Sequence, residues 1–293
     1  MRVTTAQMYN TLLSGVKQQQ TIQDQGNAQI ASGTKFQTPA QAGTAYKTSL
    51  DIRHAQVGLQ GDLESVTTAE SRLSSSMTML NDMVNVMKRA QTVAVQMSSA
   101  NVSATERLSA AQEATQLLNQ VISDANQQWQ GQSLFAGTAV DKTAFIPDAL
   151  GNMVYNGNAQ DRAVTTNDGQ QIISNIRGDN PAFAAAFSAL EGFKTALLTN
   201  DAAGVQSALG ALTSAGDGVI GMTSDVGARL SGVRLNQAAI GDRQLNLQIQ
   251  LNTHEAVDIP AVVASMQQSS IALQAAYKQI SQLQSLSLTN FLR

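Results

Sequence analysis

Apolar residues recur every seven positions along two long stretches of the chain. The first stretch carries Leu59, Val66, Leu73, Leu80, Met87 and Ala94. The second carries Val205, Leu212, Val219, Val226, Val233, Ile240 and Leu247. A seven-residue apolar repeat kept over this many turns is typical of long helices that supercoil about one another. The sequence therefore predicts a mainly α fold built on a long antiparallel helical or coiled-coil rod.

Two polar residues interrupt the companion seam of the first stretch. Four residues after the apolar positions stand Leu63, Glu70, Met77, Val84 and Gln91. Glu70 and Gln91 either fix the register of this helix against its partner or lie at a solvated edge of the seam. The sequence leaves both interpretations open.

Capping signals predict shorter helices beside the two long ones. Ser103 and Glu106 have the spacing of a capping box. The apolar residues that follow on one face are Leu108, Ala111, Leu118, Ile122, Ala125 and Trp129. Pro181 suits the first turn of another helix. With the heptad stretches, these helices define a predicted rod domain over residues 46–130 and 179–252.

The helical period is lost in the middle of the chain. Turn signals cluster at 150–152, 156–158 and 167–169, with the short runs "MVY", "RAVTT" and "QQIIS" between or after them. Residues 131–178 are therefore predicted to form a small β-rich antiparallel insertion in the rod.

The two ends of the chain carry thinner apolar stripes. We expect residues 1–45 and 253–293 to form a terminal assembly domain, with Asp258 able to cap the C-terminal helix. The N-terminal stripe is too thin to offset the entropy of ordering it alone, so residues 1–32 should become helical only against a partner. The predicted assembly residues are Met8, Leu12, Leu13, Val16, Ile22, Val262, Met266, Leu273, Tyr277, Ile280, Leu283, Leu286 and Phe291.

Composition narrows the classes of partner. Charged residues make up only 13% of the chain and the net charge is -3, which gives no electrostatic reason to expect nucleic acid or an anionic membrane as a partner. No stretch reaches the roughly 20 apolar residues of a membrane span, and the start of the chain lacks the apolar region of a cleaved secretory signal. We expect a soluble protein without a membrane segment, and any export would need a route other than a cleaved signal.

No pattern in the chain indicates catalysis, a cofactor or a metal. "HEAVD" at 254–258 begins like a zinc-protease motif, but Asp258 stands where the second histidine would be needed, and His54 is remote in the sequence. The chain has no cysteine, and no nucleophile elbow or phosphate-binding loop appears. We therefore predict that the protein is not an enzyme, with no catalytic residues, cofactor or metal.

Several local strings resemble the bacterial flagellin superfamily and, within it, the hook-filament junction proteins. "MRVTTAQMY" is similar to the opening of the family, and "ASGTKFQTPAQA" is similar to its turn after the first helix. "LFAG" at 134–137 is more typical of junction proteins than of filament flagellins, and "ALQAAYKQISQLQSLSL" at 272–288 is the strongest match. The chain departs from the family where an acidic pair often follows the Pro-containing turn, since it has "TPAQAG" there; no contact of those carboxylates carries over to Gln41 or Gly43.

The resemblance implies a structural subunit of the bacterial flagellum that joins the hook-associated proteins to the flagellin filament by helical self-assembly of its ends. The partners that it implies are copies of the chain itself in a ring or helical turn, the first hook-associated protein, flagellin and an export chaperone. It further implies secretion through the flagellar type III export channel and an extracellular location at the hook-filament junction.

Three alternatives remain at the level of the sequence. The nearest is a filament flagellin, which belongs to the same class of protein. A cytoplasmic coiled-coil signalling protein would also suit heptads rich in Ala, Gln and Ser, although no input domain is visible. An enzyme would have to use residues 131–178, which contain neither His nor Cys.

Overall fold

The computed structural model describes residues 2–167 and 169–291, with side-chain surroundings for residues 7–167 and 169–283. Two compact units divide the chain. One comprises residues 1–57 and 244–293, and the other comprises residues 58–243. Two helices of equal length, α3 (Thr44–Met97) and α6 (Ala202–Glu255), contribute residues to both units. None of the described helices is long and apolar enough to cross a membrane.

In the unit of residues 58–243, α3 and α6 run antiparallel and share the heptad seam. Side chains near the start of the α3 segment reach the far part of α6, where Arg234 and Gln237 both contact Glu70. Near the other end, Gln91 donates from its Nε2 to the carbonyl of Leu212. Both polar interruptions of the seam thus contact the partner helix. The half-buried Gln91 fits the register interpretation, whereas the Glu70 pair lies at a solvated edge of the seam, because the Arg234 side chain is 64% exposed.

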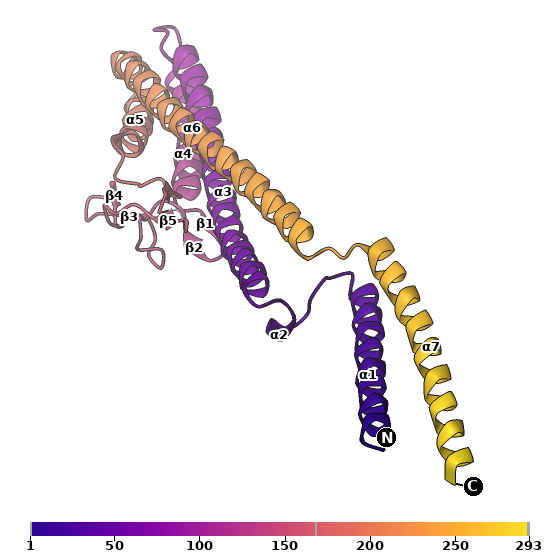
Figure 1. Ribbon diagram of the computed structural model, residues 1–293. Coiled ribbons are helices and arrows are strands. Elements are labelled where there is room, and N and C mark those ends of the chain that lie inside the picture. Colours follow the sequence, from indigo (N-terminus) through magenta and orange to yellow (C-terminus); the bar gives the residue numbers. More distant parts are fainter. Residues whose placement is uncertain (1, 168, 292–293) are drawn as a thin grey trace. The chain divides into compact units, whose positions relative to one another are not determined.

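The apolar seam forms the core of this unit. Every predicted heptad position from Val66 to Ala94 and from Val205 to Ile240 is buried. The outermost positions, Leu59 and Leu247, are half-buried. Two further helices, α4 (Ala104–Ala125) and α5 (Pro181–Leu198), pack on each other beside the seam (Figure 1). Their apolar faces belong to the same buried cluster as the seam and shield it from solvent.

The predicted cap of α4 and the predicted place of Pro181 in the first turn of α5 are confirmed. Ser103 Oγ accepts the backbone N–H of Glu106, and the Glu106 carboxylate accepts the Ser103 N–H at 2.8 Å. The predicted apolar face of α4 needs two corrections. The helix ends at Ala125, so Trp129 lies in the strand β1 (Gln128–Trp129). Leu108 is exposed, because it lies on the side of α4 away from the core.

The segment between α4 and α5 contains three two-stranded antiparallel sheets. β1 pairs with β2 (Gln132–Ser133), β3 (Phe145–Pro147) pairs with β4 (Met153–Tyr155), and β5 (Ala163–Thr165) pairs with β6 (Gln171–Ile173). The strands β4, β5 and β6 coincide with the three short runs predicted from sequence, whereas β1, β2 and β3 were not anticipated. The prediction of a mainly α fold with a small β-rich part is confirmed.

The string "LFAG" ties these sheets to the helices. Leu134, Phe135 and Ala136 are buried, and the ring of Phe135 packs 5.1 Å from that of Phe183 on α5. Gly137 follows with φ of 71°, and a Cβ there would meet the carbonyl of Asn158 at 2.3 Å. Both observations require glycine at this position.

The unit of residues 1–57 and 244–293 contains α1 (Arg2–Ser32), the short α2 (Pro39–Ala42) and α7 (Ile259–Phe291), together with one end each of α3 and α6. Pro39 occupies the first turn of α2, and Asp258 Oδ1 accepts the N–H of Ala261 at the start of α7, as predicted. Gln41 has its own role in place of the missing acidic pair, since its Oε1 accepts the N–H groups of Gln37 and Thr38.

Candidate functional site

The candidate functional site is the antiparallel pair of α1 and α7, which lie side by side in Figure 1. Two polar contacts and one close apolar approach define the pairing. Ser269 Oγ donates to the carbonyl of Gln19 at 2.9 Å, and Gln20 Nε2 donates to the Tyr277 hydroxyl at 3.3 Å. Gly26 is buried against Met266, whose Cγ and Sδ would lie 2.6 Å from a Cβ added at residue 26.

Only part of the predicted assembly stripe is covered within the pair. Val16 and Leu273 are buried, and six residues are half-buried: Leu12, Ile22, Val262, Met266, Ile280 and Leu283. Met8, Leu13 and Tyr277 are exposed. The side chains of Leu286 and Phe291 lie outside the described residues. The structure therefore brings the two predicted stripes together but leaves a good share of their apolar surface in solvent.

Other apolar residues of the pair were missed by the sequence analysis. Ile30 on α1, and Ile259 and Ile271 on α7, are exposed, with Ile271 at 68%. These residues lie off the stripe that joins the two helices, so a search for one apolar face passes over them. The sequence does contain a signal for them: α1 and α7 carry more apolar residues than one contact face needs. A pair of helices packed only on each other needs one apolar face on each helix.

A small network of contacts joins the segment that follows α1 to the segment that precedes α7. The segments after α1 and after α6 meet in an antiparallel bridge between Thr34 and Ala256. Arg53 forms an ion pair with Glu255 at 2.7 Å, and the Glu255 side chain is only 9% exposed. His254 Nε2 lies 3.0 Å from the carbonyl of Ala45 and its ring packs edge-on with Phe36.

Among the described residues, neither histidine lies in a group of three possible metal ligands. His254 is engaged with the backbone and an aromatic ring, and His54 is exposed on α3. Within residues 2–167 and 169–291, no group of three His, Asp or Glu residues is arranged to hold a metal ion.

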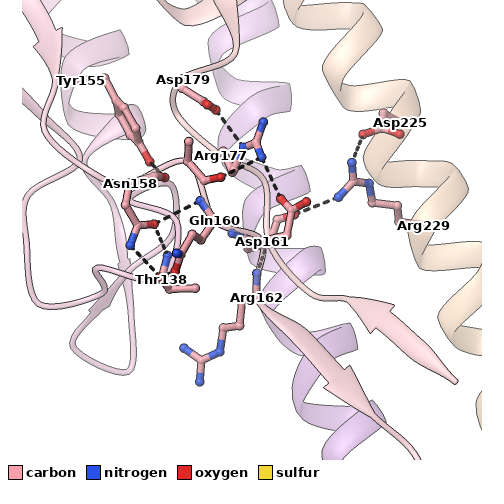
Figure 2. Close-up of polar contacts among 12 residues, drawn as sticks. Thr138, Tyr155, Asn158, Gln160, Asp161, Arg162, Arg177, Asp179, Asp225 and Arg229 are labelled. Atoms are coloured by element: carbon pink, nitrogen blue, oxygen red, sulfur yellow. Dashed lines mark hydrogen bonds and ion pairs between the residues drawn. The ribbon is translucent and has the colours of Figure 1, made fainter. Parts of the chain in front are cut away.

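The other unit carries a cleft of about 680 Å³ beside the start of α5. Its charged rim consists of Asp161, Arg177, Asp179, Asp225 and Arg229 (Figure 2). Arg177 lies between the first two aspartates, at 3.6 Å from Asp161 and 3.0 Å from Asp179, and Arg229 pairs with Asp225 at 2.8 Å. Since each carboxylate of the rim already faces a guanidinium, the cleft presents no unpaired acid or base for proton transfer.

A neighbouring tyrosine supports this interpretation. The Tyr155 hydroxyl donates to the carbonyl of Asn158 at 2.8 Å. Burial raises the pKa of Tyr155, and the charge of Asp179 raises it further. The Tyr155 hydroxyl is thus engaged as a structural hydrogen-bond donor beside the cleft.

These features define a class of protein, with long heptad helices, a small β-rich segment and an apolar pair of terminal helices. No family model matches the chain. Two curated relatives align with nearly its full length: flagellar hook-associated protein 3 of Salmonella typhimurium, 23% identical, and that of Escherichia coli, 24% identical. Each alignment covers 98% of this chain and 98% of the relative.

Solved structures share the same fold. FlgL of Bacillus cereus superposes with a TM-score of 0.61 and 20% identity, over 69% of this chain and 99% of that one. The flagellar junction protein FlgL of Legionella pneumophila gives a TM-score of 0.57 and 15% identity, over 71% of this chain and 99% of that one. The resemblance to hook-filament junction proteins found in the sequence is thereby confirmed.

Proposed function

We propose that this chain is a structural subunit of the bacterial flagellum that joins the hook-associated proteins to the flagellin filament. The observation that carries the proposal is the near full-length similarity to hook-associated protein 3, both in sequence and in fold. On this proposal the pair of α1 and α7 supplies the contacts between subunits, and the protein has no catalytic role.

The exposed apolar residues of the terminal pair support this assignment of the interface. A helix pair in water would normally turn polar residues outward, yet α7 exposes Ile271 and Tyr277. Covering such apolar surface with neighbouring molecules removes it from water and stabilises the association. Copies of the chain arranged in a ring or helical turn would do so, with the first hook-associated protein on one side and flagellin on the other.

Export and location follow from the same role. A subunit of the external flagellum must leave the cell, and we propose that it does so through the flagellar type III channel with the help of an export chaperone. A cytoplasmic coiled-coil signalling protein is not favoured, because the similarity to hook-associated protein 3 runs over the whole chain. A filament flagellin is disfavoured by the same similarity, and copy number separates the two: junction subunits are few per filament and flagellins are many.

The experiment compares two substitutions on the same helix in a strain that lacks the native gene. Ile271→Asp places a charge in the exposed apolar surface, whereas Gln274→Asp places the same charge at an exposed polar position. We expect both variants to reach the culture medium, but only Gln274→Asp to restore filaments and swimming. Normal filaments on cells that carry Ile271→Asp would refute the proposed interface. Recovery of the wild-type protein only in the cytosol would refute the flagellar location.

A further inference from the structure

A buried arginine lies between α3 and the β-rich segment without a carboxylate partner. Arg72 is 2% exposed. Its Nη2 donates to the carbonyl of Ser133, and its Nη1 lies 3.4 Å from Gln132 Oε1. Among the described residues no carboxylate forms an ion pair with Arg72. Burying an unpaired charge is costly, so buried charges in proteins are normally paired.

A second unpaired arginine converges on the same point. Arg162, the residue before β5, donates from its Nη1 to Gln132 Oε1 at 2.8 Å. The two guanidinium groups therefore share one neutral acceptor, and within the described chain Arg162 also lacks a carboxylate partner. Burial, and after it the charge of Arg162, lowers the pKa of Arg72 to about 10. At neutral pH the buried Arg72 therefore still carries its charge, and its only side-chain acceptor is a neutral amide shared with Arg162.

Three buried polar atoms on the residues of this network have no hydrogen-bond partner: Arg72 Nε, Ser133 Oγ and Asn175 Nδ2. The orientation of the Asn175 amide is fixed, because its Oδ1 accepts the backbone N–H of Arg162 at 2.8 Å and its Nδ2 is therefore the free end. All three atoms can donate a hydrogen bond. What the cluster lacks is an acceptor that carries negative charge.

We propose that Arg72, Arg162, Ser133 and Asn175 bind a small inorganic anion. The anion would accept hydrogen bonds from the three unpartnered donors and would offset the charge of the two arginines. A water molecule could accept the hydrogen bonds but would leave the buried charge of Arg72 uncompensated. A carboxylate from a neighbouring subunit does not fit, because Arg72 is closed off from the surface.

The position of the cluster gives the anion a structural role. Arg72 belongs to α3, Ser133 to β2, and Arg162 and Asn175 flank the β5–β6 hairpin. One anion therefore binds the long helix and two separate parts of the β-rich segment together. Because it binds only the folded state, it raises the stability of this unit by an amount that grows with its concentration.

The test measures the melting temperature of the full chain in chloride, sulfate and gluconate at equal ionic strength. Gluconate is the reference, since it is too large for a closed site. We expect a saturating rise in melting temperature with chloride, sulfate or both, and the arm that responds identifies a halide or an oxyanion. An equal melting temperature in all three salts at every concentration would overturn the proposal.

Variants locate the effect. Arg72→Met should abolish the salt-specific rise and should be no less stable than the wild type in gluconate, because it removes an uncompensated buried charge. Arg89→Met makes the same change on the same helix, at an exposed arginine paired with Glu113 at 2.6 Å, and should keep the rise. If Arg72→Met fails to fold, Arg162→Gln serves in its place. A salt response of the variant equal to that of the wild type would refute the site.

A crystal grown in the heavier analogue of the anion that responds, bromide for chloride or selenate for sulfate, gives an independent readout. We expect an anomalous peak within hydrogen-bond distance of Arg72 Nε and Asn175 Nδ2. Ordered water at that place, with no anomalous signal, would show that the cluster is only hydrated and would overturn the proposal.

Discussion

The heptad seam of α3 and α6 and the terminal pair of α1 and α7 begin from similar apolar stripes and end differently. In the seam, the predicted positions from Val66 to Ala94 and from Val205 to Ile240 are all buried. In the terminal pair, only Val16 and Leu273 are buried among the predicted residues whose side chains the structure describes. The difference arises from the number of neighbours, since the seam is also covered by α4, α5 and the β-rich segment, whereas two helices alone enclose no interior.

The comparison shows that an apolar stripe alone does not predict whether its residues become part of a core or part of an interface. What decides it is whether the same chain supplies enough elements to cover the stripe. Where it does, the apolar residues stabilise the unit by burial. Where the chain does not cover the stripe, the apolar surface is available to other molecules. The same kind of substitution should therefore change the stability of the two regions by different amounts.

The largest effect is expected in the aromatic core of the unit of residues 58–243. Phe183 is fully buried and its ring lies 5.1 Å from those of Phe135 and Phe145. Phe183→Ala should lower the free energy of unfolding of this unit by about 3–5 kcal/mol. Leu235→Ala, at a residue 73% exposed on α6, is the control and should change it by less than about 0.5 kcal/mol. Chemical denaturation followed by circular dichroism measures both, and equal losses would contradict the assignment of the core.

A smaller and local effect is expected in the terminal pair. A side chain at residue 26 would collide with Met266, so Gly26→Leu should destabilise the pairing of α1 with α7 by about 1–3 kcal/mol. Gly15→Leu is the matched control, because nothing lies within 4 Å of a Cβ at that position and the change improves helix propensity.

Amide hydrogen exchange, measured separately for each region, compares these two variants. Gly26→Leu should speed exchange in α1 and α7 and leave the heptad seam protected, whereas Gly15→Leu should not speed it anywhere. If Gly26→Leu exposed the seam as well, the two regions would be one cooperative unit and the comparison would fail.

The heptad helices, the caps and the turns were predictable because each rests on local signals. The spacing of Ser103 and Glu106 specifies a cap, and the repeat specifies which face of α3 is buried. The end of α4 was missed, since Trp129 continues the helical period in sequence but pairs with Gln132 in space. The exposed position of Ile271 and the convergence of Arg72 with Arg162 depend on long-range contacts, which no local pattern encodes. The three-part division of the chain and the ordering of the ends only in company stay predictions.

Within the well-covered unit, one buried carboxylate is expected to weaken the fold. Asp124 is 6% exposed at the last turn of α4, and one of its oxygens has no hydrogen-bond partner. Burial raises the pKa of Asp124 above its ordinary value, and the charge of Asp82 raises it further, although a hydrogen bond from Gln120 opposes the shift. The folded state therefore holds this proton more tightly than the unfolded state does, and stability falls as the pH rises from the unfolded pKa through the folded one.

Asp124→Asn removes this penalty. We expect the variant to exceed the wild type by about 1 kcal/mol in free energy of unfolding at pH 7, because the charge no longer lies buried at a helix C-terminus. The gap should close when the pH falls below the ordinary pKa of an aspartate. Denaturation curves at both pH values measure it, and a gap that is the same in acid as at neutral pH would exclude Asp124 ionisation as the cause.

The smallest effect concerns the polar interruption of the seam at Glu70. Hydrogen bonds from Arg234 and Gln237 lower the pKa of Glu70, so the folded state favours the charged form, and this stabilisation is present above the unfolded pKa and lost as the pH falls through the folded one. The pair is largely in solvent, so Glu70→Gln should cost only about 0.2–1 kcal/mol at pH 7 and nothing in strong acid. Glu64→Gln, at an exposed residue of the same helix, is the control and should show no such pH dependence. If Glu70→Gln lowered the free energy of unfolding by several kcal/mol, the register of α3 on α6 would depend on this polar contact and not on the apolar residues around it. The contrast between the packed seam and the uncovered terminal pair would then need another cause.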